Sequence, residues 1–299
     1  MTTYLAPMVG HIGLKLRMAL AGSILFGLYL AAAGVAYLLY GGGILPIVLI
    51  GSVVLVLFQY KFGKWAALRS VGAEDMPEEG GYGEIHRTVE HLSEEMGIEK
   101  PRLMVADMGV PNAFAVGRKG AGVVVVSTEI VQLLDRQELE GVLAHELAHI
   151  SNRDVVIMLL GQSIASIVGI VVQYVVLFTG ERNIASYFLA MFAGMIANTL
   201  VMIFVLAISR YREYVADGDA AQYTGNPDAM ARALEKISKG AKAKQEAAAG
   251  GRGRQQSEEV GPPDEVAALC IFEGDRGILR TIFATHPPVE KRIQRLRSA

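Results

Sequence analysis

Two histidines four residues apart, with a glutamate directly after the first, carry the clearest chemistry in this sequence. They form the run His145-Glu146-Leu147-Ala148-His149. On a helix, side chains four positions apart lie on one face, so both imidazoles can reach a single tetrahedral zinc ion. Glu146 would then lie beside the position that such a site leaves open to water, where it can accept a proton. The alternative is a pair of histidines that cap or line a helix.

A zinc ion in a site of this type needs a third protein ligand, and Glu213 is the candidate. His149 precedes an apolar segment at residues 155–179, and Glu213 follows another at residues 184–208. If the two segments form an antiparallel helical hairpin and both helices continue for about one and a half turns, Glu213 lies level with His149. Asp217, four residues further on, could then accept a hydrogen bond from a ligand histidine and fix its tautomer.

The elements that must position these residues include four apolar segments, at residues 18–40, 44–60, 155–179 and 184–208. Of the 299 residues, 52% are apolar and only 19% are charged, whereas a soluble domain carries about a quarter charged residues. The first segment has the length that crosses a bilayer and is too long for the apolar region of a signal peptide. We therefore expect two transmembrane helical hairpins; the alternative is core helices of a large soluble protein.

Basic residues predict the orientation of these hairpins, because cytoplasmic flanks carry an excess of Lys and Arg. The short links hold only Arg182, whereas the other flanks hold Lys15, Arg17, Lys61, Lys64, Arg69, Arg153, Arg210 and Arg212. Both termini and the segments around the histidines are therefore expected on the cytoplasmic side. The single cysteine, Cys270, fits a reducing compartment weakly and excludes a four-cysteine zinc site. The net charge of −2 gives no attraction to nucleic acid.

The remaining segments predict a small α+β structure. Helices are expected at 82–96, 128–134, from 136, at 226–239 and at 289–297, and strands at 103–105, 113–116 and 123–126. The last two strands flank a glycine-rich turn and should form a hairpin. Residues 242–264 are expected to be a mobile loop. In the last helix Lys291, Arg292, Arg295 and Arg297 are expected on a solvated or headgroup-facing surface.

Several motifs, in this order along the chain, resemble the HtpX family of membrane-integrated zinc metalloproteases, which are of the gluzincin type and related to CAAX prenyl proteases. They are Pro111-Asn112-Ala113-Phe114-Ala115, the run from His145 to His149, the run from Ser209 to Asp217, and Thr285-His286-Pro287-Pro288 followed by Arg292. The resemblance covers nearly the whole chain. It implies four transmembrane helices with a cytoplasmic α+β zincin-like protease domain that contains a small β-sheet, and one zinc ion per chain.

By this resemblance His286 is expected to stabilise the oxyanion of the reaction, the alternative being a structural histidine in a turn. Residues Asn112, Ala113, Phe114 and Ala115 would offer a strand edge on which an extended substrate adds by backbone hydrogen bonds. The alternative is an ordinary inner strand. Within this set Glu146 is the general base, His145, His149 and Glu213 are the zinc ligands, and Asp217 supports a ligand.

The predicted organisation is a transmembrane hairpin at 1–61, a protease part with the histidine motif at 62–154, a second hairpin at 155–208, and a protease part with the third ligand at 209–299. The predicted function is a zinc metalloendopeptidase of the cell membrane that cleaves misfolded or damaged membrane proteins, or unfolded proteins, on the cytoplasmic side. Its partners are these substrates and the lipid bilayer, with no nucleic acid, and no oligomeric state is predicted. The alternatives are a CAAX-type prenyl protein protease and a non-catalytic zinc-containing membrane scaffold.

Overall fold

The computed structural model describes residues 8–181, 183–250 and 286–298. The chain divides into two compact units. The first, here called the hairpin unit, comprises Met1–Phe62 and Val156–Tyr211, and the second, the sheet unit, comprises Gly63–Val155 and Arg212–Ala299. Each unit is therefore built from two stretches of sequence.

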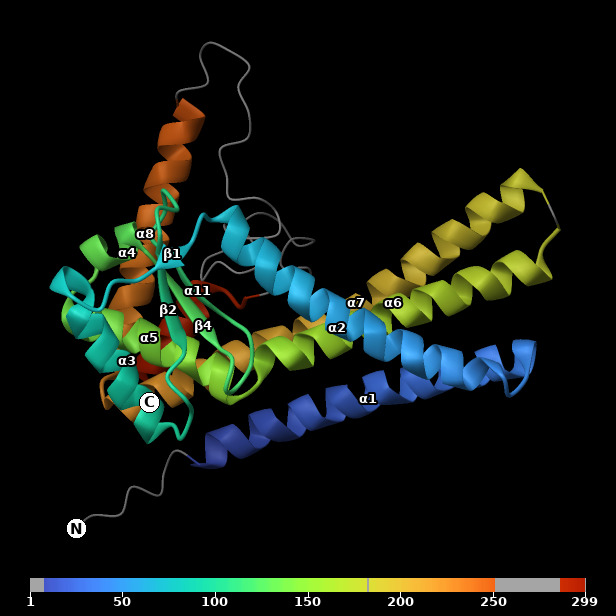
Figure 1. Cartoon of the computed structure of the whole chain (residues 1–299), viewed down its shortest axis with the longest axis horizontal. Coiled ribbons are helices and arrows are strands. Elements are labelled where there is room, and N and C mark those ends of the chain that lie inside the picture. Colours follow the sequence, from blue (N-terminus) through green and yellow to red (C-terminus); the bar gives the residue numbers. More distant parts are fainter. Residues whose placement is uncertain (1–7, 182, 251–285, 299) are drawn as a thin grey trace. The chain divides into compact units, whose positions relative to one another are not determined.

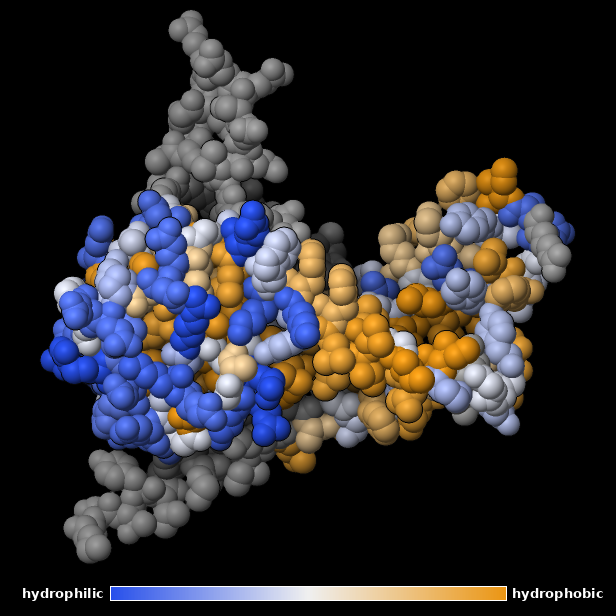
Figure 2. All heavy atoms as spheres, viewed as in Figure 1, coloured by the Kyte–Doolittle hydropathy of each residue, from blue (hydrophilic) through white to orange (hydrophobic). Residues whose placement is uncertain are grey.

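Four long helices supply the hairpin unit (Figure 1). They are α1 (Met8–Tyr40), α2 (Ile44–Ser70), α6 (Asp154–Thr179) and α7 (Ile184–Thr224). The C-terminal ends of α2 and α7 belong to the sheet unit. Three stretches within the described residues are long and apolar enough to cross a membrane: Gly22–Tyr40, Asp154–Thr179 and Ile184–Thr224. Figure 2 shows apolar side chains gathered on the surface of these helices, where a water-soluble unit would carry polar ones.

Helices α6 and α7 approach each other closely because glycines face one another at their crossing. A Cβ atom on Gly169 would lie 2.9 Å from the carbonyl oxygen of Gly194, and one on Gly194 would lie 2.7 Å from that of Gly169. Such small residues let backbones meet in a bilayer, where there is no hydrophobic drive between helices. Ser163 of α6 adds a hydrogen bond to Gln59 of α2, with 2.7 Å between the oxygens.

A four-stranded sheet in the order β1-β2-β4-β3 organises the sheet unit. The strands are β1 (Glu74–Asp75), β2 (Arg102–Ala106), β3 (Ala113–Val116) and β4 (Val123–Ser127). Strand β4 pairs in parallel with β2 and antiparallel with β3, as the glycine-rich turn predicted for the hairpin. Alternate residues of β4 belong to two hydrophobic clusters, one on each face of the sheet. This explains its unbroken run of valines, which is typical of a strand buried on both faces.

The larger cluster joins the sheet to the helices of this unit. These are η1 (Gly80–Tyr82), α3 (Gly83–Glu95), α4 (Thr128–Leu133), α5 (Arg136–Ser151), α8 (Pro227–Gly250) and α11 (Val289–Arg297). Helix α5 packs against β3, α3 and α8. Its approach to α8 is close, since a Cβ atom on Gly141 would lie 3.3 Å from the backbone of Met230. The helix that carries the two histidines is thus fixed on several sides.

Two predicted helix boundaries were wrong. Helix α8 continues to Gly250, so the first residues of the predicted loop at 242–264 are helical; the alanines at 247–249 are strong helix formers, and residues 251–264 lie outside the described part. Helix α6 does not run back to His149, because α5 ends at Ser151 and a turn at Asn152-Arg153 separates the two helices. Helix α7, by contrast, continues through Glu213 and Asp217 as predicted.

Candidate metal centre

Helix α5 presents His145 and His149 one turn apart. The helix begins with a capping box, in which the Asp135 side chain accepts from the backbone N–H of Glu138 and the Glu138 side chain accepts from that of Asp135. Such a box satisfies otherwise unpaired backbone donors and fixes where the helix starts. The two imidazole rings lie 4.6 Å apart between centroids and nearly perpendicular. Their Nε2 atoms approach to 3.1 Å, so both nitrogens point toward one place.

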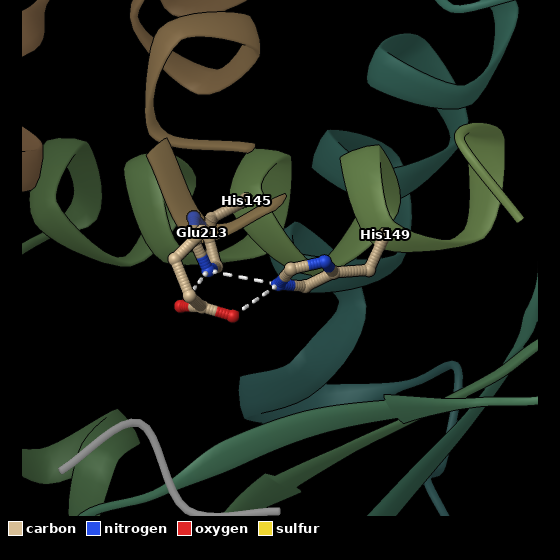
Figure 3. Close-up of side chains that lie close together, drawn as sticks. All are labelled: His145, His149 and Glu213. Carbon is tan, nitrogen blue, oxygen red and sulfur yellow. Dashed lines mark hydrogen bonds and ion pairs between the residues drawn. The ribbon is translucent and has the colours of Figure 1, made fainter. Parts of the chain in front are cut away.

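Glu213 of α7 meets these two nitrogens (Figure 3). Its Oε1 lies 3.4 Å from Nε2 of His149, and its Oε2 lies 3.5 Å from Nε2 of His145. One potential ligand atom from each of the three residues lies within 4.8 Å of the others, an arrangement that could hold a metal ion. The structure therefore brings together the three residues that the sequence predicted as ligands, although most of the α6–α7 hairpin separates Glu213 from the two histidines in the sequence.

Asp217 supports His145 from behind. Its Oδ1 lies 3.1 Å from Nδ1 of His145, on the ring side opposite to Glu213. Arg292 of α11 in turn donates hydrogen bonds to both oxygens of Asp217, at 2.8 and 2.6 Å, and its Nη1 lies 3.1 Å from Oε2 of Glu213. Arg292 is fully buried, so its predicted place on a solvated surface was wrong. It shares the buried face of α11 with Val289 and Leu296. This buried face was not recognised in the sequence, because the other basic residues of the helix suggested an exposed surface.

Asp154 occupies the corresponding place behind His149 and was missed from the sequence. Nδ1 of His149 donates to Oδ2 of Asp154 at 2.6 Å, and Nε of Arg212 lies 3.0 Å from the other oxygen of Asp154. All but a few per cent of the Asp154 side chain is buried. Its position at the start of an apolar segment, five residues after His149, was the available clue.

The charges of this cluster shift the pKa values of its members. Burial would lower the pKa of His149, but the hydrogen bond to Asp154 and the carboxylate of Glu213 outweigh it and raise that pKa to about 10. The pKa of His145 is likewise raised, since Asp217 and Glu213 outweigh its burial. Burial raises the pKa of Glu146, which makes its carboxylate a stronger base. Without a metal ion His149 is thus protonated at neutral pH, and Glu146 is placed beside it as a base.

His286 lies next to the third predicted ligand. Its Nδ1 is 3.0 Å from Oε2 of Glu213. Within the described part of the chain, the other ring nitrogen of His286, Nε2, is buried without a hydrogen-bond partner. Buried polar atoms of this kind are rare unless an ion, water or substrate satisfies them. Two imidazoles and a carboxylate are also a donor set that suits zinc, so the residues present fit a metal ion.

The predicted substrate strand lies at an edge of the sheet. Within the residues that the structure describes, strand β3 pairs only with β4 and is an edge strand. Asn112, just before it, pairs its backbone with Ser127: its N–H donates to the Ser127 hydroxyl, and its carbonyl accepts from the Ser127 N–H. The side chains of Ala113, Phe114 and Ala115 are buried. The edge of β3 therefore presents backbone hydrogen-bonding groups and not side chains, and the strand contacts helix α5.

Taken together, the long apolar helices and the two-histidine, one-glutamate centre define a membrane metallopeptidase. The chain belongs to peptidase family M48, whose model matches residues 81–299. A protease HtpX homolog of Halobacterium salinarum is 57% identical over 290 residues, which cover 94% of this chain and 100% of that protein. One of Pyrococcus furiosus is 37% identical over 302 residues, with 96% of each chain covered. Both confirm the family resemblance that the motifs indicated.

A solved structure shares the fold. The crystal structure of S. mikatae Ste24p matches with a TM-score of 0.55 and 18% identity, over 98% of this chain and 66% of that one. At this level of identity the match supports the architecture alone. The chain is thus a multi-pass membrane protein and a metal-dependent peptidase by family.

Proposed function

We propose that this protein is a zinc-dependent endopeptidase that cleaves misfolded or damaged membrane proteins on the cytoplasmic side of the cell membrane. The observation that carries the proposal is the convergence of His145, His149 and Glu213, with Glu146 on the same helical turn as the first histidine. A purely structural zinc site usually has four protein ligands. Three ligands beside a buried carboxylate are instead the arrangement of a catalytic site.

Each residue of the cluster has a role in peptide hydrolysis. A bound zinc ion would lower the pKa of a water molecule and polarise the scissile carbonyl. Glu146, whose pKa is raised by burial, takes a proton from the attacking water and delivers it to the leaving amine. His286, beside Glu213, is placed to donate to the oxyanion that develops. Asp217 holds the ring of His145 in one orientation.

The edge of β3 is the proposed substrate-binding element. An extended peptide that pairs with residues 112–115 would add a strand to the sheet through backbone hydrogen bonds. Since the side chains of Ala113, Phe114 and Ala115 are buried, they make few contacts that could select a sequence. Low selectivity suits a quality-control enzyme, whose substrates share exposed backbone rather than a common sequence.

The topology we propose has four transmembrane helices and two cytoplasmic protease parts, with hairpins at 1–61 and 155–208 and protease parts at 62–154 and 209–299. Helix α2, whose apolar stretch at 44–60 is shorter than the others, is the fourth span. Its basic residues Lys61, Lys64 and Arg69 follow that stretch, as expected at a cytoplasmic end. Reporter fusions at the α1–α2 link and at the C-terminus test this: an active cytoplasmic reporter is expected only at the C-terminus.

The proposed activity is tested with the detergent-purified full-length protein and casein as an unfolded substrate. Cleavage is expected with added zinc, should stop with a chelator and return when zinc is restored. Glu146→Gln should bind zinc but not cleave, because the general base is lost. Zinc binding with no cleavage by the wild type would instead support a scaffold. Cleavage confined to prenylated C-terminal peptides would support a CAAX-type protease.

A further inference from the structure

We propose that Asp154 is a positioning residue for the ligand His149, and that Arg212 holds Asp154 in place. The inference rests on the proposed metal site, because it concerns how one of its ligands is oriented. It adds a second carboxylate–arginine pair to the one that Asp217 and Arg292 form behind His145. The two pairs come from different places in the chain and serve different histidines.

The geometry at His149 assigns a task to each ring nitrogen. Nδ1 is 2.6 Å from Oδ2 of Asp154, whereas Nε2 is 3.4 Å from Oε1 of Glu213. A proton on Nδ1 that is donated to Asp154 leaves the lone pair of Nε2 free on the side of the other two ligands. A carboxylate in this position fixes the tautomer and raises the basicity of the imidazole toward a metal ion.

Arg212 makes this arrangement possible in a buried place. Its Nε lies 3.0 Å from Oδ1 of Asp154, so one carboxylate oxygen faces the imidazole and the other faces the guanidinium. Both Asp154 and Arg212 are buried, and a buried carboxylate is costly unless it is paired. Arg212 directly precedes Glu213 in α7. The contacts from His149 to Asp154 and from Asp154 to Arg212 therefore also connect the proposed ligand His149 to the backbone that carries the proposed ligand Glu213.

The backbone between α5 and α6 is shaped for this contact. In an uninterrupted helix a residue five positions further on points about 140° away, so Asp154 could not reach His149. The helix instead ends at Ser151, and Arg153 adopts a φ of 59°. Among the described residues it is the only one other than glycine with a positive φ, a conformation that costs energy for a residue with a Cβ atom. This turn brings the Asp154 carboxylate back under His149.

The experiment measures zinc affinity of the full-length protein by competition with a chelator, in the wild type, Asp154→Asn and Arg212→Gln. Asp154→Asn should weaken binding by about 10 to 100-fold, and Arg212→Gln by less, because the carboxylate remains. At saturating cobalt(II), the visible spectrum of Asp154→Asn should differ from that of the wild type, since the donor strength of His149 changes. The double variant should bind no more weakly than Asp154→Asn, because the two residues act as one unit.

Asn152→Ala is the matched control. The Asn152 side chain donates to Asp219 at 2.8 Å, so it also ties the end of α5 to α7. Among the described residues, no side-chain hydrogen bond or ion pair joins it to either histidine. It should lower stability without changing zinc affinity or the cobalt spectrum. Equal losses of affinity in Asn152→Ala and Asp154→Asn would mean that Asp154 only anchors the turn, and would overturn the inference.

Two further outcomes separate this inference from the proposed function. If the wild type binds no zinc, the proposed metal site itself is wrong. If the wild type binds zinc and Asp154→Asn binds it equally tightly, with the same cobalt spectrum, only the role of Asp154 is overturned. If the variants do not fold, ¹⁵N NMR of histidine-labelled wild type with zinc decides. A proton on Nδ1 of His149 is expected, and a proton on its Nε2 would overturn the inference.

Discussion

Arg292 donates hydrogen bonds to both carboxylate oxygens of Asp217, although the two residues are 75 positions apart in the sequence. The same guanidinium lies 3.1 Å from Glu213. One buried cation thus faces two carboxylates, and the planar fork of arginine suits this better than the point charge of lysine. Helix α11, which carries Arg292, is therefore part of the structure that holds the residues of the candidate metal centre in place.

Replacing Arg292 should destabilise the sheet unit. Arg292→Met removes the buried guanidinium that faces Asp217 and Glu213, and breaking a buried ion pair in this way costs about 3–5 kcal/mol in comparable cases. Arg292→Lys should restore only part of this, because it cannot bind both oxygens of Asp217 in a planar fork. The measurement is denaturant unfolding of the metal-free protein in detergent. Lys291→Met, at an exposed neighbouring position, is the control and should change little; an equal loss there would refute the explanation.

The three proposed ligands should each be needed for zinc. Purified wild type is expected to contain about one zinc ion per chain, and His145→Ala, His149→Ala and Glu213→Ala should lose most of it, since a site of three protein ligands holds metal weakly after losing one. Elemental analysis of the purified proteins measures this. A nearly full complement of zinc in Glu213→Ala would remove Glu213 from the ligand set.

Asp217→Asn should weaken zinc binding or activity by about 10 to 100-fold without abolishing either. The amide can still face Nδ1 of His145, but it carries no charge to raise the basicity of the ring. Chelator competition and casein cleavage are the measurements. Identical zinc affinity and activity in Asp217→Asn and the wild type would show that Asp217 does not support the metal site.

Zinc binding should release protons at neutral pH. In the metal-free protein the pKa of His149 is raised to about 10, so at pH 7 its ring is protonated and must lose that proton to become a ligand. The apparent affinity should therefore rise as the pH increases toward 10. The stability of the metal-free protein should change in the opposite direction. Protonation of His149 contributes fully to the free energy of unfolding below about pH 6.5, and this contribution is lost as the pH rises toward 10.

Calorimetry of zinc binding in buffers of different ionisation enthalpy counts the released protons. At least one proton per zinc is expected at pH 7 in the wild type. An apparent affinity that does not change between pH 7 and pH 9, with no proton released, would contradict the raised pKa of His149.

Gly169→Ala should destabilise the α6–α7 hairpin, because the added methyl group would lie 2.9 Å from the Gly194 carbonyl oxygen and 3.0 Å from Cβ of Asn198. Overpacking of this kind costs about 1–3 kcal/mol. Gly51→Ala in α2, where nothing lies within 4 Å of the new Cβ, is the control and should be neutral or slightly stabilising. Thermal unfolding in detergent compares the two, and equal melting temperatures would argue against close packing at Gly169.

The predicted ligand set and most of the secondary structure followed from local patterns. The spacing of His145 and His149 predicts a shared helical face, and the apolar lengths of α6 and α7 bring Glu213 back toward it. Asp154 and Arg292 were missed for physical reasons. Asp154 reaches His149 only because of a helix break, which depends on the strained backbone of Arg153 and not on residue spacing. Arg292 is buried only because acidic partners far away in the sequence compensate its charge.

The separation of the histidines from Glu213 by the α6–α7 hairpin sets an order in time. A chain is made from its N-terminus, so the histidine motif leaves the ribosome before the hairpin, Glu213 follows the hairpin, and Arg292 follows Glu213. A nascent chain or a fragment that ends within the hairpin holds the two imidazoles and Glu146 but lacks the remaining ligand. With Glu213 as the proposed third ligand, peptidase activity is therefore expected only after the second membrane hairpin and the start of the segment that follows it have been made.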